Sequence, residues 1–126
     1  MNLSLLNSVR MNVMERLALH LKKEISLQAA GFDGEPGVLN NVGKRFIRVD
    51  EHYYVPSSMQ EIVLLGVPRK GTGTRVNIRT FYADRFEAAL ICTGQDFVEL
   101  AVNRPEEEEE LCVLVPLNKM IGIETL

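Results

Sequence analysis

Two periodicities of apolar residues divide this chain into a helical segment and a long β-rich remainder. Between residues 4 and 23 the apolar side chains recur every three or four positions, which places them on one face of a helix: Leu6, Val9, Val13, Leu17 and Leu21. Ser4 is suited to cap the N-terminus of that helix. We therefore predict an N-terminal amphipathic helix within residues 1–23 that covers the open end of a small β-barrel. A partner-binding or membrane-surface helix is the alternative.

From Glu24 onward the apolar period changes to two, which is typical of half-buried strands. Ile25, Leu27 and Ala29 alternate with polar residues, and similar short segments recur between turn residues to the end of the chain. The pattern predicts a mainly β chain with about five short strands in each half. The expected strands are residues 24–29, 38–42, 46–49, 53–55 and 59–65, followed by residues 76–81, 86–93, 97–102, 111–115 and 119–125.

The second half repeats the order of the first half at a nearly constant distance. Between residues 25 and 51 the matching residues lie 51 positions apart: Asp33, Leu39, Gly43 and Phe46 match Asp84, Leu90, Gly94 and Phe97. Further on, Tyr54-Val55-Pro56 with Met59 and Ile62 matches Leu114-Val115-Pro116 with Met120 and Ile123. A fixed offset of this kind indicates an internal repeat.

The repeated order is a strand, a turn with Asp, a bent strand with Leu, a Gly turn, Phe-Val-x-Leu and a Val-Pro segment. It resembles the Sm-like barrel, a relative of SH3-type barrels, and is similar to small Sm-like proteins of spore-forming bacteria. The resemblance implies two tandem Sm-like barrels after one α-helix. Its boundaries are a first repeat at residues 24–66, a linker at 67–75 and a second repeat at 76–126 that includes an acidic loop at 103–110.

Each repeat is too short to bury a core comfortably alone, so two copies are expected to cover each other's apolar faces. Sm-like subunits also associate by pairing edge strands, and unpaired edges tend to be filled. We therefore expect a pseudo-twofold pair within the chain. Further association into a dimer or ring, or with another protein, is expected to follow the same rule.

The charge and composition of the chain limit the classes of partner that we expect it to bind. The net charge of −3 provides no overall basic field for nucleic acid or an anionic membrane. No run of apolar residues reaches the length of a membrane span, and Arg10, Glu15 and Arg16 interrupt the N-terminal segment, so a cytoplasmic protein is expected. The acidic loop is read as a solvated segment, or alternatively as a contact for a basic partner or a loose cation site. The residues of this candidate partner surface are Glu106, Glu107, Glu108, Glu109 and Glu110.

RNA binding is the alternative function, and the sequence disfavours it. RNA-binding rings of the Sm and Hfq type carry an Asp and an Asn after the third-strand Leu, and Arg-Gly or Lys-His in the last hairpin. The matching positions here hold Gly43 and Ile47, Gly94 and Val98, and the Pro56-Ser57 and Pro116-Leu117 pairs. Single-stranded RNA needs stacking rings and cations, which Tyr53, Tyr54 and Phe81 would supply together with a candidate nucleic-acid surface. The basic residues of that surface are Lys44, Arg45, Arg48, Arg69, Lys70 and Arg75.

The sequence contains little that supports a catalytic site or a metal site. His20 and His52 are far apart and are expected at the surface, and no metal-ligand spacing or nucleophile motif occurs. Asp33 and Asp84 are read as turn residues that bond their own backbone. The glycine-rich linker lacks the spacing of a phosphate-binding loop. Cys92 and Cys112 are expected to be reduced thiols, with a disulfide or a thiol-based role as the alternative.

These observations favour a non-enzymatic Sm-like binding or scaffold protein that acts through protein association, as an oligomeric regulatory or spore-related protein. No cofactor and no metal are predicted. An RNA-binding Sm-like protein with an atypical surface is the alternative, and a hydrolase is the least supported class.

Overall fold

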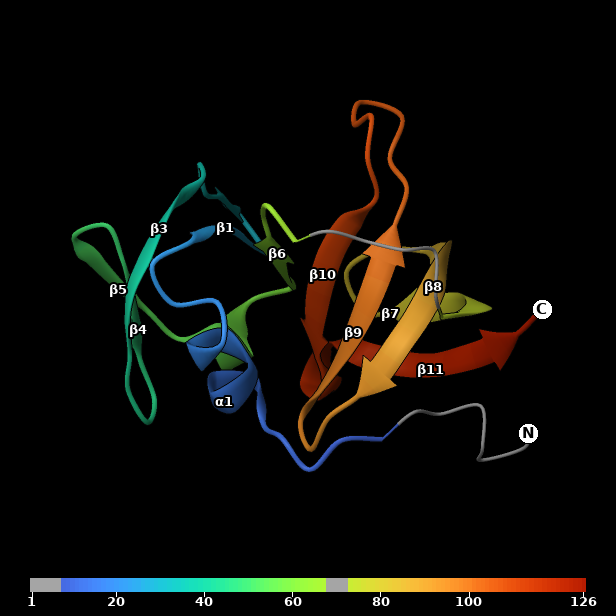
Figure 1. Ribbon diagram of the computed structural model, residues 1–126. Helices are drawn as coiled ribbons and strands as arrows, with labels where there is room; N and C mark the ends of the chain where they lie inside the picture. The colour runs from blue at the N-terminus through green and yellow to red at the C-terminus, as the bar shows by residue number, and fades with distance from the viewer. Residues whose placement is uncertain (1–7, 68–72) are drawn as a thin grey trace.

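The computed structural model describes residues 8–67 and 73–126 and shows a mainly β protein with one short α-helix (Figure 1). This confirms the predicted fold class at that level. The helix α1 spans Val13–Ala18. Two 3-10 helices, η2 at Pro56–Ser58 and η3 at Leu117–Lys119, each precede the last strand of a half. The strands are β1 (Glu24–Ala29), β2 (Phe32–Asp33), β3 (Gly37–Val42), β4 (Ile47–Val49), β5 (His52–Tyr54), β6 (Glu61–Leu64), β7 (Thr74–Thr80), β8 (Arg85–Thr93), β9 (Phe97–Val102), β10 (Leu111–Pro116) and β11 (Met120–Thr125).

All strands belong to one open, antiparallel sheet. Its order is β11-β7-β8-β9-β10-β6-β1-β3-β4-β5, and β2 pairs with β1 beside this path. Within the first half the order is β6-β1-β3-β4-β5, and within the second half it is β11-β7-β8-β9-β10. In both halves the last strand therefore lies next to the first. The pairing of β10 with β6 joins the two halves into a single sheet.

The positions matched by the sequence alternate in the same way in both halves. Ile25 and Val76 are buried on β1 and β7, and two residues later Leu27 and Ile78 are buried as well. After the third strand the register differs from the expected one. Tyr54 lies opposite Ile47, whereas Val115 lies opposite Val98. The structural offset is therefore 61 residues at this point, and the two Val-Pro pairs are displaced from each other by one position.

The expected pseudo-twofold arrangement is wrong, because the two halves join head to tail. A twofold axis requires the same surface on both partners. Here the fourth strand of the second half, β10, pairs with the fifth strand of the first half, β6. These strands are not equivalent, so the junction is heterologous and leaves a different edge unused at each end of the sheet.

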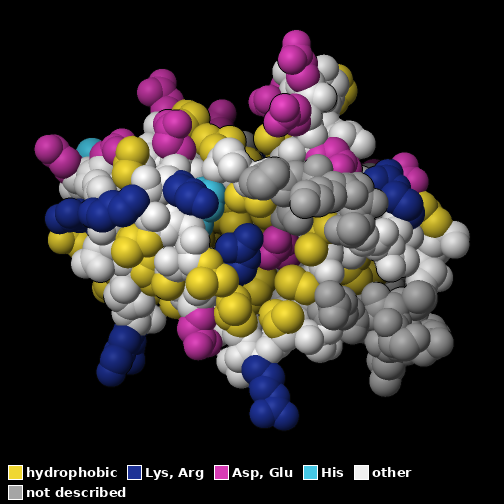
Figure 2. All heavy atoms as spheres, in the orientation of Figure 1, with side chains coloured by type: hydrophobic (Ala, Val, Ile, Leu, Met, Phe, Trp, Pro, Cys, Tyr) yellow, Lys and Arg dark blue, Asp and Glu magenta, His cyan; other side chains and the backbone are white. Residues whose placement is uncertain are grey.

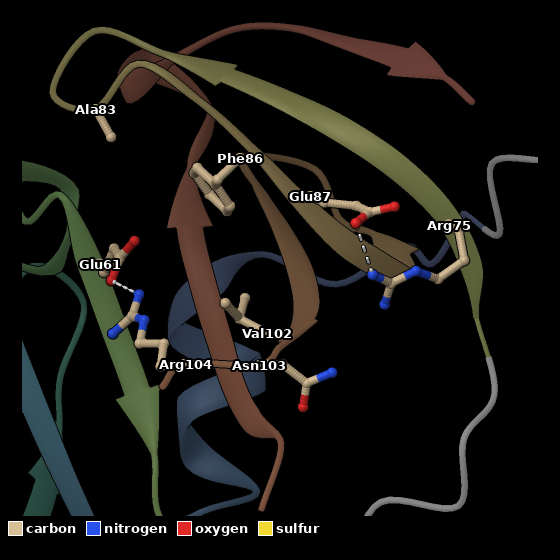
Figure 3. Close-up of a pocket in the computed structure, with 8 residues that line it drawn as sticks. All are labelled: Glu61, Arg75, Ala83, Phe86, Glu87, Val102, Asn103 and Arg104. Carbon is tan, nitrogen blue, oxygen red and sulfur yellow. Dashed lines mark hydrogen bonds and ion pairs between the residues drawn. The ribbon is translucent and has the colours of Figure 1, made fainter. Parts of the chain in front are cut away.

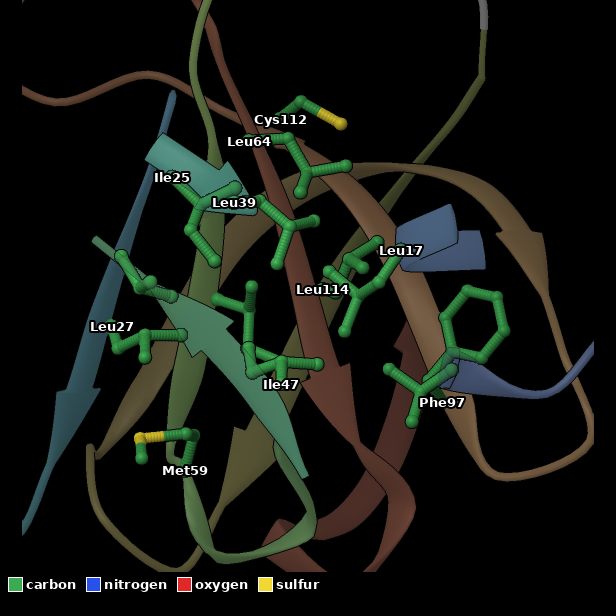
Figure 4. Packing of buried hydrophobic residues seen from close by; sticks show 13 residues of the cluster. Leu17, Ile25, Leu27, Leu39, Ile47, Met59, Leu64, Phe97, Cys112 and Leu114 are labelled. Carbon is green, nitrogen blue, oxygen red and sulfur yellow. The ribbon is translucent and has the colours of Figure 1, made fainter. Parts of the chain in front are cut away.

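Two hydrophobic cores lie on opposite sides of the junction strands. Ile62 and Leu64 on β6 face the first core, together with Leu114 on β10, whereas Val63 and Val113 face the second core. Figure 4 shows the first core, in which Leu64, Cys112 and Leu114 lie among side chains of the first half. Because successive residues of β6 and β10 face alternate cores, both faces of each strand are buried, except that Leu111 at the start of β10 is half-buried.

Helix α1 is shorter than the sequence pattern predicts. It begins after Asn12, whose side chain accepts a hydrogen bond from the Glu15 N–H, and Ser4 lies outside the described residues. After α1 the chain turns at Lys22, which has a positive φ of 71°. The Lys22 N–H donates to the Leu39 carbonyl at 2.7 Å, so this segment pairs with β3 and does not continue the helix. Only part of the predicted stripe is buried, and Leu21 is exposed.

Candidate functional site

The strands β5 and β11 lie at the two ends of the sheet path. Within residues 8–67 and 73–126, β5 pairs only with β4, and β11 pairs only with β7. An edge strand presents a row of unpaired backbone groups to which another strand can bond. Both ends also carry exposed apolar side chains, since Tyr53 is 64% exposed and Ile121 is 59% exposed. These two edges are the candidate association surfaces of the protein.

The junction between the halves shows how such edges pair in this protein. Three consecutive residues of β10 lie opposite three residues of β6: Cys112 opposite Leu64, Val113 opposite Val63, and Leu114 opposite Ile62. All six side chains are buried. The pairing of a fourth strand with a fifth strand therefore buries apolar surface on both faces of the sheet.

Two phenylalanines at matching turns, Phe46 and Phe97, differ in how far the neighbouring elements of the structure bury their side chains. The Gly43 N–H donates to the Phe46 carbonyl at 2.9 Å, and the Gly94 N–H donates to the Phe97 carbonyl at 2.8 Å. The two turns therefore share this backbone hydrogen bond. Phe97 is fully buried in the first core, near Leu17 of α1 (Figure 4), whereas Phe46 is 53% exposed. The side chains differ because β9 and β10 are covered by β6 and α1, whereas β5 is at the end of the sheet.

The structure brings together three of the six predicted basic residues. Lys44 and Arg45 are exposed in the turn between β3 and β4. Arg48 lies on β4 directly opposite Tyr53, and its Nε atom is buried with no hydrogen-bond partner among the described residues. Arg75 lies on β7 in the other half, 3.4 Å from Glu87. The predicted Arg69 and Lys70 lie outside the described residues. The predicted ring Tyr53 shares the face of Arg48, whereas Tyr54 packs against the first core and Phe81 is exposed on the second half.

The predicted acidic loop forms the connection between β9 and β10. Glu106, Glu107, Glu108 and Glu109 are exposed, and Glu110 is half-buried. Figure 2 shows acidic side chains along the upper side of the molecule, with the loop at the highest point. Together with residues 64–67 at the end of β6, the loop borders a cavity of about 430 Å³. This arrangement agrees with a solvated loop, and none of the described residues that line the cavity is basic.

A buried polar cluster that the sequence did not reveal holds the base of this loop. Glu61 on β6 is 4% exposed, and its Oε1 accepts a hydrogen bond from Arg104 at 2.5 Å. Its Oε2 accepts from the Tyr82 hydroxyl at 2.8 Å. Figure 3 shows the Glu61–Arg104 pair at one side of a cavity of about 580 Å³, with Phe86 in the middle. The only available signal was a carboxylate within an otherwise apolar strand.

The electrostatics of this cluster favour a structural role. Burial and the neighbouring Glu61 carboxylate raise the pKa of Tyr82 well above its ordinary value, so its hydroxyl stays protonated and donates. Arg104 compensates the buried charge of Glu61. Each oxygen of the carboxylate has a donor, which leaves no activated acid, base or nucleophile in the cluster. It fastens the second half to β6 of the first half.

A second buried ion pair, also not foreseen, attaches α1 to the second half. Arg16 lies 2.7 Å from Glu99 of β9, which is 5% exposed. The Val13 N–H donates to Asp96 at 2.7 Å at the start of the helix. Beneath this pair, the Cys112 thiol lies 3.5 Å from Glu99. Helix α1 is therefore fixed to β9 by charge and to the first core by its apolar side chains.

The prediction that His20 lies at the surface is wrong. Its ring is 2% exposed, and its Nε2 lies 2.9 Å from the Glu24 carbonyl. Burial lowers the pKa of His20, so the neutral ring is favoured and Nε2 carries the proton that it donates. His52 is exposed, as predicted. Cys92 and Cys112 are thiols, the first partly buried on β8 and the second buried on β10.

The part of the chain that the structure describes contains no group of three or more side chains arranged to ligate a metal ion. None of the described helices has the length and apolar character needed to cross a bilayer. Comparisons with known protein families, with curated proteins and with solved structures found no match.

Proposed function

We propose that this chain is a non-enzymatic, tandem Sm-like association protein that assembles head to tail, with β5 of one copy pairing with β11 of the next. One observation carries the proposal. The junction inside the chain already joins the fourth strand of one half to the fifth strand of the other, and the sheet ends in one strand of each kind. The exposed Tyr53 and Ile121 mark those ends as surfaces that a partner would cover.

The internal junction also predicts the register of the contact between copies. With the offset of 61 residues, Leu114 corresponds to Tyr53, and Ile62 corresponds to Ile123. Because Leu114 lies opposite Ile62 in the junction, Tyr53 is expected opposite Ile123 of a second copy. Tyr53 would then pack at the edge of the second core of the neighbouring copy, as Leu114 of β10 packs in the first core within the chain.

A heterologous contact of this kind generates either a closed ring or an open filament, depending on the rotation between copies. The resemblance to Sm-like barrels supports a ring, because subunits of that type associate through their edge strands. In this proposal the chain acts as a scaffold or regulatory oligomer, and a role related to sporulation follows from the resemblance alone.

Solution mass measurements on two complementary variants test the proposal. Tyr53→Lys places a charge at the β5 edge, and Ile121→Lys places one at the β11 edge. Both side chains are more than half exposed, so the fold is expected to tolerate the changes. Leu19→Lys, at an exposed apolar residue away from both edges, is the matched control.

We expect the wild type and Leu19→Lys to form species larger than the 14.2 kDa chain, whereas each edge variant alone is a monomer. A mixture of the two edge variants retains one intact β5 and one intact β11, so it is expected to form a dimer and no larger species. A wild type that remains monomeric at high concentration would refute the proposal, as would a mixture that gives no dimer.

RNA binding by the outer face of β4 and β5 is a second candidate. Its supporting observation is that Lys44, Arg45 and Arg48 share this part of the molecule with the exposed rings of Phe46 and Tyr53. Gel retardation with short mixed RNAs at low and moderate salt tests it. Salt-sensitive binding that is lost when the three basic residues are changed to Glu would favour RNA binding. Binding that survives these changes would exclude this face.

A further inference from the structure

A cavity of about 340 Å³ lies in the first half, between β2 and β5, away from the junction. Its inner wall is apolar and is formed by Ile25, Leu27 and Val49. Apart from Gly34 and Pro36, the remaining lining combines aromatic rings with carboxylates: Phe32, His52, Tyr54, Asp33, Glu35 and Asp50. Among the described residues, no lysine or arginine lines the cavity. An anionic ligand would therefore find no counter-charge there, whereas a cation would.

Three rings form a continuous row along this cavity. The centroids of Phe32 and Tyr54 are 5.7 Å apart, with an angle of 44° between the ring planes. The centroids of His52 and Tyr54 are 6.3 Å apart, with an angle of 46°. Neighbouring rings are therefore tilted against each other and do not form a flat stack. A cation seated against Tyr54 can approach the neighbouring rings as well, within the distance of about 6 Å at which ring faces attract positive charge.

Local backbone geometry holds the two ends of this row in place. A Cβ at Gly34 would lie 3.0 Å from the Phe32 ring and 2.9 Å from the Leu27 carbonyl, so the ring folds closely over the glycine. On the opposite side, a Cβ at Gly37 would lie 2.5 Å from Asp50 Oδ2. The other oxygen of Asp50 accepts the Val38 N–H at 2.9 Å, which fixes this carboxylate beside the cavity.

The other two carboxylates lie at the rim of the cavity. Asp33 and Glu35 are exposed, and within the described residues neither has an ion-pair partner. Their negative charge is therefore not compensated from within the described structure. Asp33 was expected to act as a turn residue that bonds its own backbone, and its side chain makes no such hydrogen bond within residues 8–67 and 73–126.

The matching end of the second half has different chemistry. The offset of 51 residues places Ala83 at the position of Phe32 and Phe86 at the position of Glu35. In that half, the cavity beside Phe86 is bordered by the Glu61–Arg104 pair, in which the charges balance (Figure 3). The row of rings and the uncompensated carboxylates are therefore features of the first half and do not follow from the repeated fold.

We propose that the cavity between β2 and β5 binds an alkylated ammonium group, such as a quaternary amine or a methylated lysine side chain. The rings offer their faces to the weakly hydrated alkyl groups, and Asp33 and Glu35 supply the opposite charge. A hard metal ion would find no cluster of three ligands among the described residues. This site is independent of the edge pairing in the proposed function, since the cavity faces the core side of β5 and not its edge.

Chemical-shift titrations with tetramethylammonium and with neopentyl alcohol, a neutral molecule of similar shape, test the proposal. We expect tetramethylammonium to shift the resonances of Phe32, His52 and Tyr54 saturably, and the alcohol to shift them much less. Capped trimethyllysine is expected to bind at least as well as tetramethylammonium, and capped unmodified lysine several-fold more weakly, because its ammonium group is more strongly hydrated. The two lysine probes separate a peptide ligand from a free small amine.

Variants then separate the two contributions. Asp33→Asn with Glu35→Gln changes only exposed side chains and is expected to weaken binding several-fold, whereas Asp84→Asn, at the matching turn of the second half, leaves it unchanged. Tyr54→Leu is expected to weaken binding by roughly fivefold or more through the lost ring face. If Tyr54→Leu does not fold, added salt is expected to weaken wild-type binding. The proposal is overturned if tetramethylammonium and the alcohol bind alike, if neither saturates, if unmodified lysine binds as tightly as trimethyllysine, or if the rim variant and added salt have no effect.

Discussion

Replacing Phe46 and Phe97 by alanine, one at a time, measures how much the different surroundings of these two matching positions change the stability that each ring contributes. Phe97 and Phe46 follow turns with the same backbone hydrogen bond, but their side chains are 0% and 53% exposed. Loss of a fully buried Phe ring costs about 3–5 kcal/mol, because the transfer free energy and a cavity both contribute. Phe46 buries only about half of its ring and its removal leaves no enclosed cavity, so about 1 kcal/mol is expected.

Urea unfolding followed by far-UV circular dichroism suits this comparison, since the chain has no Trp. At protein concentrations where every variant is monomeric, Phe97→Ala should lower the unfolding free energy by about 3 kcal/mol more than Phe46→Ala does. That difference corresponds to a melting temperature lower by about 10 °C for a domain of this size. Phe81→Ala, at a ring that is 72% exposed, is the control and should change little.

Equal costs for Phe46→Ala and Phe97→Ala would refute this reasoning, because they would show that both rings are buried to the same extent in the monomer. A cost below about 1 kcal/mol for Phe97→Ala would also contradict it, since no collapse of the surroundings is expected to fill a cavity between α1 and the sheet completely.

Three other predictions concern the buried polar groups. Arg16→Met should lower the unfolding free energy by about 3 kcal/mol, because it leaves Glu99 buried without its cation. The double variant with Glu99→Met should recover much of that loss. A double variant as unstable as Arg16→Met alone would contradict the argument. The pKa of Tyr82 is raised in the folded state, so the stability that Tyr82 contributes should be present below pH 10 and decline as the pH rises above it. In denaturant unfolding, Tyr82→Phe should reduce this decline of the unfolding free energy. A variant whose stability depends on pH as that of the wild type does would contradict the assignment. The pKa of His20 is lowered from 6.5, so the stability that His20 contributes should be present above pH 6.5 and decline as the pH falls below it. In the same assay, the unfolding free energy of His20→Gln should fall less steeply in acid. An unchanged acid dependence would exclude His20 as the cause of the decline.

Strands such as β1, β4 and β7 were predictable because buried residues alternate with more exposed ones along them. The strands β6, β9 and β10 are nearly continuous apolar segments, and their turn residues marked their ends. The internal repeat was predicted from the same pattern, and the matching turns at Gly43 and Gly94 share one backbone hydrogen bond, donated by the glycine. The helix was overestimated, because the spacing of Leu17 and Leu21 does not reveal that the backbone of Lys22 and Lys23 bonds to Leu39. Sequence periodicity indicates which residues lie on one face of an element. It does not indicate where the helix stops because its backbone groups bond to another part of the chain.

The buried polar contacts were not predictable, because their partners come from distant parts of the chain. Glu61 and Arg104 are 43 residues apart, and Arg16 and Glu99 are 83 residues apart. A lone carboxylate in an apolar strand indicates only that some partner is needed. The different exposure of Phe46 and Phe97 was not predictable for a related reason, since matching positions acquire different neighbours when the two halves join head to tail.

The strands β6 and β10 contribute side chains to both cores, and this has a consequence for cooperativity. If the first half opened alone, Leu114 and Cys112 would lose their cover while β10 stayed folded. If the second half opened alone, Val63 would be exposed on β6. Neither half can melt without destabilising the other, so calorimetry should record one transition for the whole chain. Amide hydrogen exchange should be slowest at the paired backbone of Val63 and Val113.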